Sequence, residues 1–462
     1  MIVLPLFALY NIKCLFSIFI KKFCGTHEPT RCLELSELGR KILNNEELTL
    51  SYLGKCVQDS YNPTTNKGGY VNFGTAVSTL CDDIMLARLN APGTFEFEAK
   101  DLHHSTMWGT SECREAIANL LTRLLSPDRP LHADNVIVVN GGSAAMEVLA
   151  CNLFDPGDVL ITPSPCYTRI FRNFNDRFQI QVVDLFLREK SSKYGETATF
   201  ELTAALLEDG IRDHIARGKN VKGFMLVNPN NPLGDVYSPE LVVELLFVCN
   251  KYDIHFICNE VYAMSIYEPG FEFQSVINMK PLPNPNKTHI IWSVSKNINL
   301  PGMRLGAIIT WNEEFIQAAK NGCIYSSVST VAQKIITKVL NDPGWIEEKF
   351  LPTHQQRLRE AALKTRAVLS SLGIYVRPAH AGFFLWADLR PHMKEISIAG
   401  EIALFEEFLN HKVYIIPGSV VHCVEPGWFR IVFSLQSDIL DEGMKRIAAV
   451  LKGLSTPKKL HN

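Results

Sequence analysis

The chain has 462 residues, enough for two or three domains around a large buried core. Hydrophobic residues make up 47% of it and charged residues 20%, as in an ordinary globular protein, and the net charge of −2 leaves no electrostatic footprint for nucleic acid. The 12 cysteines include no C-x-x-C pair and no Cys/His metal spacing, so the sequence predicts no disulfide scaffold, no metal site and a cytoplasmic protein.

Residues 1–20 are mostly apolar and are followed by two lysines, which makes the segment nearly long enough to span a bilayer. Pro5 and Lys13 interrupt it, and no clear cleavage site for a secretory signal follows. Two interpretations stay open. Either the segment anchors the protein in a membrane, or it is an additional arm of a cytoplasmic protein.

Strand-like apolar runs alternate with stretches of helical spacing between about residues 131 and 325. This alternation predicts a mostly parallel sheet with helices on both faces. Helices are expected at 143–154 and 239–252, among other places. The expected strands number seven and have the sequences NVIVVN, DVLITP, QIQVVDLF, GFMLVN, IHFICN, HIIWSV and LGAIIT.

The pattern changes after residue 335. A long polar helix over about 347–373 leads into the short strands GFFLWADL, VYIIPG and WFRIVFS and then into a final helix that ends near residue 454. This succession predicts a smaller α+β domain. The expected division of the chain is an apolar segment and linker at 1–45, an arm and part of the small domain at 46–100, a large domain at 101–335 and the small domain at 336–462.

Polar residues follow several of the expected strands, at the edge where open α/β sheets bind ligands. Gly142 and Ser143 follow NVIVVN where a helix begins, and the free N–H groups and dipole of a helix N-terminus suit a phosphate. Tyr167 follows DVLITP, where its ring is placed to stack on a planar cofactor. Taken alone, each feature is also common in ordinary α/β turns.

The stretch NPNNPLGD follows the strand GFMLVN. Its two Asn-Pro pairs predict a tight turn that aims the Asn231 amide, a good donor to a phenolate, at one point. A plain turn would have the same composition. The stretch NEVY places Asn259 and Tyr262 at the end of the next strand.

In the stretch SVSKNINLPGMRLG, Ser293 and Lys296 follow the apolar run HIIW, and Arg304 lies further along. A lysine amine there can form a Schiff base with an aldehyde, and an arginine fork suits phosphate. In HCVEPGWFRIVFS, Arg430 lies on a strand of the smaller domain and could pair with a substrate carboxylate. A surface lysine and a surface ion pair are the alternatives.

Together these residues supply the parts that a pyridoxal phosphate enzyme needs. Their order resembles the fold-type I pyridoxal phosphate enzymes of the class I/II aminotransferase group, above all 1-aminocyclopropane-1-carboxylate synthases and their animal synthase-like relatives. The resemblance covers about residues 50–455. It rests on NPNNPLG, SVSKNINLPGMRLG and HCVEPGWFR, with support from AGFFLWADLR.

The resemblance implies that Lys296 forms the Schiff base with pyridoxal 5'-phosphate and is catalytic together with Tyr262. It also implies that Arg430 binds the α-carboxylate of a small amino acid, and that the protein is a homodimer with its sites at the subunit boundary. The cofactor-binding residues that it implies are Gly142, Ser143, Tyr167, Asn231, Asn259, Tyr262, Ser293, Lys296 and Arg304.

Three positions depart from the family pattern. The family has an aspartate where this chain has Asn259, and an amide cannot act as counter-ion to a protonated pyridine. Val77 stands where synthases have a glutamate near the substrate, and Met107 stands where they have an active-site tyrosine. His103, His104 or Trp108 could partly replace that tyrosine.

Two functions of different classes follow from these observations. The first is a pyridoxal phosphate-dependent aminotransferase that acts on a small amino acid, in favour of which are Lys296 and Arg430. The second is a catalytically weak or inactive protein that keeps the fold as a binding or interaction module, in favour of which are Asn259, Val77 and Met107. A synthase acting on S-adenosylmethionine ranks last, and a β-lyase is compatible with the same residues.

Overall fold

The computed structural model describes residues 35–45, 48–125, 127, 130–188 and 200–455. The chain divides into two units between Glu46 and Glu47. The described part of the first unit holds the helix α2 (Glu37–Asn44), which begins where the side chain of Ser36 accepts a hydrogen bond from the Gly39 N–H. The apolar segment at residues 1–20 lies outside the described residues. Among the described residues, no helix has the length and apolar character needed to cross a bilayer.

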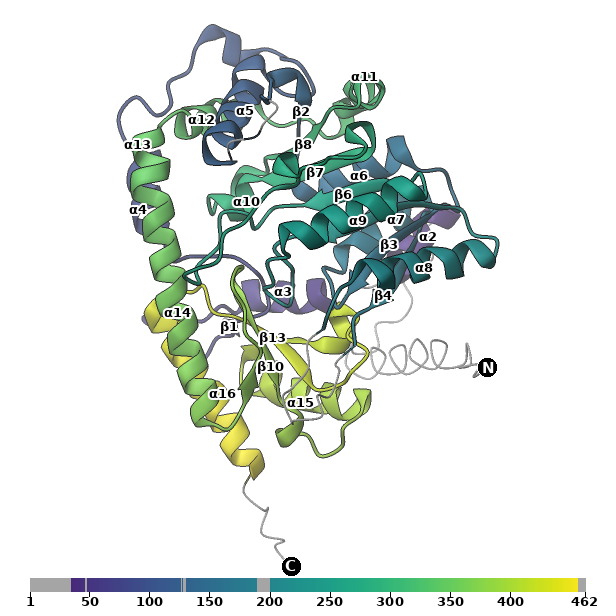
Figure 1. Ribbon diagram of the computed structural model, residues 1–462. Coiled ribbons are helices and arrows are strands. Elements are labelled where there is room, and N and C mark those ends of the chain that lie inside the picture. The colour runs from purple at the N-terminus through teal and green to yellow at the C-terminus, as the bar shows by residue number, and fades with distance from the viewer. Residues whose placement is uncertain (1–34, 46–47, 126, 128–129, 189–199, 456–462) are drawn as a thin grey trace, which may run out of the picture. The chain divides into compact units, whose positions relative to one another are not determined.

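A seven-stranded sheet forms the centre of the second unit (Figure 1). The spatial order of its strands is β2-β8-β7-β6-β5-β3-β4. Neighbours from β4 to β7 are parallel, and β8 is antiparallel to both β2 and β7. The predicted seven-stranded, mostly parallel sheet is therefore confirmed. The strands are β2 (Val136–Val139), β3 (Val159–Ser164), β4 (Gln181–Phe186), β5 (Val221–Val227), β6 (His255–Asn259), β7 (Thr288–Ser293) and β8 (Gly306–Thr310).

The sheet is buried on both faces. Successive side chains of a strand point to opposite sides, so each strand contributes residues to a core on either face. In β5, Phe224 and Leu226 belong to one core cluster, whereas Met225 and Val227 belong to the other. Helices α8 (Ala204–Ala216) and α9 (Pro239–Lys251) supply residues to the first cluster. Helices α6 (Gly141–Leu153), α7 (Arg169–Phe178) and α11 (Glu313–Gly322) supply residues to the second. In Figure 1, α8 and α9 lie in front of the sheet and α6 and α7 behind it.

Local sequence signals explain where the two predicted helices begin. Helix α9 starts where expected, because the Ser238 side chain accepts from the Leu241 N–H and Pro239 occupies the first turn. Helix α6 starts two residues earlier than expected, at Gly141. This glycine has a φ of +85°, so the chain turns directly from β2 into the helix.

A four-stranded sheet in the order β12-β13-β10-β9 lies in the C-terminal part of the chain, as predicted for the smaller α+β domain. A separate pair joins β1 to β11 in parallel, so residues between 46 and 100 are attached to this part. The domain boundaries at 100 and 335 remain predictions. The strands are β1 (Val71–Asn72), β9 (Tyr375–Val376), β10 (Phe384–Asp388), β11 (Val413–Tyr414), β12 (Ile416–Pro417) and β13 (Trp428–Val432).

The long helix expected over 347–373 is divided into two parts. A π-helical turn at Ile346–Phe350 precedes α14 (Leu351–Ser371), and Pro352, which has no N–H to donate, lies in the first turn of α14. Figure 1 shows α14 as a long helix that leads away from α13 (Pro343–Trp345) and lies beside α16 (Ser437–Ser455) at its other end. The remaining helices are α3 (Leu48–Gln58), α4 (Asp82–Leu89), α5 (Ser111–Leu125), α10 (Val294–Asn297), α12 (Thr330–Leu340), α13 (Pro343–Trp345), α15 (Ile398–Asn410) and α16 (Ser437–Ser455).

Candidate active site

A cavity of about 320 Å³ lies where three neighbouring parallel strands end. Val227, Asn259 and Ser293 are the last residues of β5, β6 and β7, and all three line it. Parallel strands bring their carboxyl ends to one edge of a sheet, which is why residues far apart in sequence meet there. The cavity also contains every site residue predicted from the sequence, namely Gly142, Ser143, Tyr167, Asn231, Asn259, Tyr262, Ser293, Lys296, Arg304 and Arg430.

One end of the cavity has the features of a phosphate site. Gly142 and Ser143 lie in the first turn of α6, where backbone N–H groups have no partner within the helix. The Arg304 guanidinium lies beside this turn, because a Cβ added to Gly141 would come within 2.7 Å of its Nη2. A Cβ on Gly142 would approach no atom closer than 3.8 Å, so the turn leaves space beside the N–H groups.

Lys296 lies in the short helix α10 that follows β7. The Ser293 side chain caps this helix by accepting from the Ser295 N–H at 3.1 Å. The Lys296 amine donates to the carbonyl of Ala76. Burial, followed by the neighbouring cations Arg430 and Arg304, lowers the pKa of the Lys296 amine from 10.5 to about 8. The neutral, nucleophilic form of this amine is therefore far more populated near neutral pH than that of a surface lysine.

Arg430 brings the second sheet into the cavity. It lies on β13 with a side chain that is almost fully buried, and its Nη1 donates to Asn231 Oδ1 at 2.8 Å. Its Nη2 donates to the carbonyl of Gly74. The bond to Arg430 uses the Asn231 oxygen, so the Asn231 NH₂ group is the part of this amide left to donate to a ligand.

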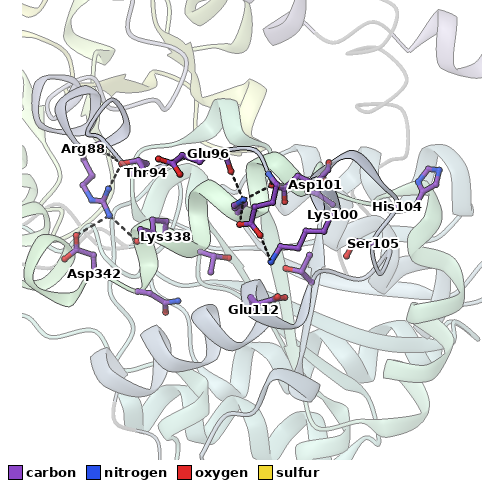
Figure 2. Close-up of a pocket in the computed structure, with 17 residues that line it drawn as sticks. Arg88, Thr94, Glu96, Lys100, Asp101, His104, Ser105, Glu112, Lys338 and Asp342 are labelled. Carbon is purple, nitrogen blue, oxygen red and sulfur yellow. Dashed lines mark hydrogen bonds and ion pairs between the residues drawn. The ribbon is translucent and has the colours of Figure 1, made fainter.

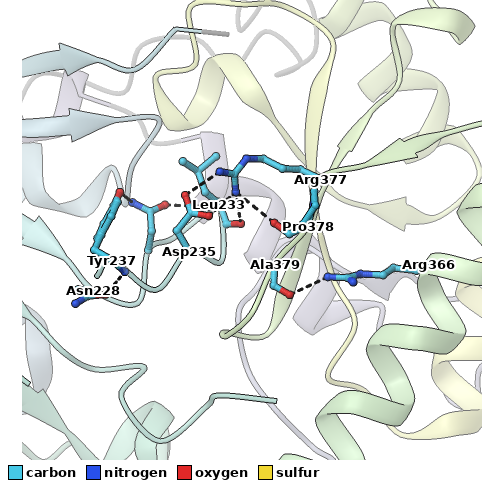
Figure 3. A network of polar contacts seen from close by, with 9 residues as sticks. Asn228, Leu233, Asp235, Tyr237, Arg366, Arg377, Pro378 and Ala379 are labelled. Carbon is cyan, nitrogen blue, oxygen red and sulfur yellow. Dashed lines mark hydrogen bonds and ion pairs between the residues drawn. The ribbon is translucent and has the colours of Figure 1, made fainter. Parts of the chain in front are cut away.

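The loop that carries Asn231 is held by a polar network, shown in Figure 3. Both terminal nitrogens of Arg377 donate to the Asp235 carboxylate, at 2.6 and 3.0 Å. Within the loop, Asn228 Oδ1 accepts from the Tyr237 N–H at 3.2 Å, and Asn230 Nδ2 donates to the Tyr237 hydroxyl at 3.2 Å. The predicted tight turn is thus fixed both internally and by Arg377, which lies between β9 and β10 of the smaller sheet.

Asn259 and Glu260 are neighbours in the chain, but their side chains lie in different environments. Asn259 lines the cavity, and its Oδ1 accepts from the Val261 N–H at 3.3 Å. The Glu260 carboxylate accepts from the Ser275 hydroxyl at 2.5 Å and from the Val276 N–H at 2.8 Å, and burial raises its pKa to about 7. Glu260 therefore supplies no charge to the cavity, as expected from strand alternation.

The electrostatic character of the cavity is strongly positive. Among the described residues that line it, four are cationic and none carries a carboxylate; the cations are Arg169, Lys296, Arg304 and Arg430. A site of this kind favours a ligand with several negative charges. A helix-terminal anion site, a half-buried amine with a lowered pKa and an amide donor in one cavity fit a phosphorylated aldehyde with a ring oxygen, such as pyridoxal phosphate.

Some residues of the site gave no signal in the sequence. The carbonyls of Gly74 and Ala76 bind Arg430 and Lys296, but a backbone oxygen is present at every position. Leu50 and Leu53 of α3 and Tyr414 of β11 also line the cavity without any motif around them. Ser295 also lines the cavity. It immediately precedes Lys296 in the polar stretch after β7, so its residue type and position were enough to predict it as a site residue from the sequence.

A larger pocket of about 820 Å³ lies elsewhere, between α4, the segment after it, α5 and α12 (Figure 2). Three of the cations that line it, Arg88, Lys100 and Lys334, form ion pairs with carboxylates. Lys334 contacts Glu98 at 2.8 Å and Asp101 at 2.6 Å, and Arg88 contacts Asp342 at 3.2 Å. Size alone does not make it the better candidate, because hydrogen bonds to Asp101 and Glu98 raise the pKa of the Lys334 amine, whereas a Schiff-base lysine needs a lowered one.

Of the three positions that depart from the family pattern, Asn259 lines the 320 Å³ cavity, whereas Val77, Met107 and the residues considered as replacements do not. Ala76 lines it, but Val77 does not, and the Val77 carbonyl accepts from the Ser434 hydroxyl at 2.9 Å. Met107 and Trp108 pack against the core cluster that contains α6. His104 lines the larger pocket of Figure 2, and His103 lines neither.

Comparison with known proteins agrees with this geometry. The model of the aminotransferase class I and II family matches residues 79–447. The human 1-aminocyclopropane-1-carboxylate synthase-like protein 1 is 34% identical over 397 residues, which cover 86% of this chain and 79% of the human protein. The mouse protein named "Probable inactive 1-aminocyclopropane-1-carboxylate synthase-like protein 2" is 32% identical over 417 residues, which cover 90% of this chain and 72% of the mouse protein.

Solved structures share the fold at low sequence identity. N-succinyldiaminopimelate aminotransferase from Mycobacterium tuberculosis has a TM-score of 0.71 at 18% identity, over 90% of this chain and 100% of that one. Aspartate aminotransferase from Thermotoga maritima has a TM-score of 0.70 at 21% identity, with the same coverage. The fold is thus that of the fold-type I aminotransferases. The chain belongs to the class I and II aminotransferase family, and the resemblance seen in the sequence is confirmed.

Proposed function

We propose that this chain binds pyridoxal 5'-phosphate in the 320 Å³ cavity and acts as an aminotransferase on a small amino acid. The observation that carries the proposal is the position of Lys296. Its half-buried amine, with a pKa lowered to about 8, shares the cavity with the anion site at the start of α6 and with Arg430. When bound, the cofactor would withdraw electrons from the α-carbon of the amino acid.

Each residue has a separate task in this proposal. Ser143, Gly142 and Arg304 bind the phosphate, and Tyr167 covers one face of the ring. Asn231 and Tyr262 donate to the ring oxygen. Arg430 binds the α-carboxylate, and Lys296 holds the cofactor and then accepts the α-proton as general base.

A second function is supported by Asn259 and by the absence of a carboxylate among the described residues that line the cavity. In this alternative the protein retains the cofactor but has little turnover, and it serves as a binding or interaction module. The name of the mouse relative, which includes the word inactive, is consistent with such a role in the family. A homodimer is proposed from the family alone.

Absorption spectroscopy tests the proposal and separates the two functions. Purified protein is titrated with pyridoxal phosphate and then with a panel of amino acids, beside a Lys296→Ala control. An aminotransferase shows a cofactor band that requires Lys296 and that changes with small amino acids, with formation of the matching keto acid. A band that requires Lys296 and ignores every amino acid supports the binding module. A wild-type spectrum identical to that of the control contradicts both.

A further inference from the structure

Asn259 occupies the position that decides how the cofactor ring is polarised. It is the last residue of β6, is 3% exposed and lines the cavity between Val227 of β5 and Ser293 of β7. The proposed function assigns the phosphate to α6 and Arg304, the aldehyde to Lys296 and the ring oxygen to Asn231 and Tyr262. The pyridine nitrogen is the polar ring atom that remains. Of the two polar strand-end side chains, Ser293 already donates to the Leu305 carbonyl at 3.0 Å and caps α10, which leaves Asn259.

The backbone fixes which atom of the Asn259 amide is engaged within the protein. The Val261 N–H can only donate a hydrogen bond, so the amide atom 3.3 Å from it must be the oxygen Oδ1. The NH₂ group is then directed elsewhere, and among the described residues none accepts a hydrogen bond from it. An NH₂ group can donate to an unprotonated pyridine nitrogen, but against a protonated one two donors would face each other.

The charges around the cavity act in the same direction. Lys296, Arg304 and Arg430 all line it, and nearby positive charges disfavour the protonated, cationic form of a pyridine. The carboxylate of the next residue in the chain, Glu260, accepts hydrogen bonds from Ser275 and Val276 and lines a different pocket. It therefore cannot act as counter-ion in place of the missing aspartate.

We infer that Asn259 donates a hydrogen bond to the pyridine nitrogen of the bound cofactor and that this nitrogen stays unprotonated in the resting protein. This inference rests on the proposed function, because it requires the cofactor to be bound at Lys296. An unprotonated ring accepts less of the negative charge that develops when the substrate loses its α-proton. We therefore expect the protein to retain the cofactor but to remove the α-proton of a substrate slowly.

Nitrogen NMR of the bound cofactor tests the inference without relying on turnover. Pyridoxal phosphate labelled with ¹⁵N in the ring is bound to the wild-type protein and to the variants Asn259→Asp and Asn259→Ala. The wild-type and Asn259→Ala signals are expected at the position of an unprotonated pyridine, and the Asn259→Asp signal at the protonated position. A wild-type signal at the protonated position overturns the inference, whether or not either variant folds.

Two further readouts separate this inference from the proposed function. If bound cofactor fails to attach to Lys296 in the wild type, the proposed function fails and this inference with it. If the cofactor attaches and the wild-type nitrogen is protonated, only the inference fails. We also expect Asn259→Asp to exchange the α-hydrogen of a bound amino acid for deuterium about a hundredfold faster than the wild type. An unchanged exchange rate contradicts the electronic role of Asn259.

Discussion

Arg430 of β13 donates to Asn231 in the loop after β5, so one 2.8 Å hydrogen bond joins the smaller sheet to the central sheet inside the cavity. The two residues are 199 positions apart in the chain. The bond orients the Asn231 amide, because it engages the amide oxygen and leaves the NH₂ group for the ligand. Any movement of one sheet against the other would therefore alter the proposed cofactor and substrate contacts together.

The first prediction concerns the proposed carboxylate site. Arg430→Lys keeps the charge but replaces a planar fork by a single ammonium, so we expect amino acid binding to weaken about ten- to a hundredfold. The dissociation constant is measured from the change in cofactor absorbance. Arg217→Lys, at an exposed position of the same residue type, is the control and should change nothing. Equal dissociation constants for Arg430→Lys and wild type would contradict the assignment of Arg430.

The second prediction concerns the phosphate site. In Gly141→Ala the new methyl group would meet Arg304 Nη2 at 2.7 Å, and the φ of +85° is strained for alanine. We expect a loss of about 1–2 kcal/mol in the free energy of unfolding and faster loss of cofactor on dialysis. Gly302→Ala is the matched control, because its Cβ would meet nothing within 4 Å. Cofactor loss at the same rate in both variants would disprove the role of this close approach.

The third prediction concerns the pair that holds the Asn231 loop. The side chains of Arg377 and Asp235 are only 11% and 16% exposed, so removal of one partner leaves a poorly solvated charge. We expect Arg377→Ala to lower the free energy of unfolding by about 3 kcal/mol, measured by urea denaturation. The double variant Arg377→Ala/Asp235→Ala should lose less than the sum of the two single variants.

The control for this pair is Arg217→Ala, which removes a partner of the exposed ion pair with Asp213 and should change stability very little. Additive effects of the Arg377 and Asp235 substitutions would show that the two side chains do not act as a unit.

The fourth prediction is a pH dependence of cofactor uptake. The neutral amine of Lys296 is the reactive form, and burial together with Arg430 and Arg304 lowers its pKa to about 8. The uptake rate should therefore rise with pH and level off above about 8, whereas an ordinary lysine would continue to gain up to 10.5. Arg430→Gln removes one cation, so its midpoint should move to higher pH. A wild-type midpoint above 10 would contradict this environment for Lys296.

Much of the fold could be predicted from the sequence, because strands buried on both faces of a sheet appear as continuous apolar runs. Continuous apolar runs marked the seven strands of the central sheet, and Ser238-Pro239 marked the start of α9. The interruption before α14 was missed, although Pro352 was visible in the sequence. The start of α6 was placed two residues late because the turn depends on the positive φ of Gly141.

The candidate site was predictable as far as side chains at strand ends are concerned, because parallel strands end at one edge. Contacts made by backbone carbonyls, such as those of Gly74 and Ala76, could not be read from residue types. The orientations of two amides could not be predicted from the sequence either. A hydrogen bond to Arg430 orients Asn231, and a hydrogen bond from the Val261 N–H orients Asn259.

Covalent trapping at Lys296 tests the central claim most directly. The protein is mixed with pyridoxal phosphate, reduced with borohydride and digested, and the peptides are weighed by mass spectrometry, with Lys296→Ala and the exposed-position variant Lys219→Ala as controls. We predict one dominant adduct, on the peptide that contains Lys296, which persists in Lys219→Ala and is lost in Lys296→Ala. An adduct spread over many lysines, or no adduct on Lys296, would contradict the proposal that this cavity binds the cofactor.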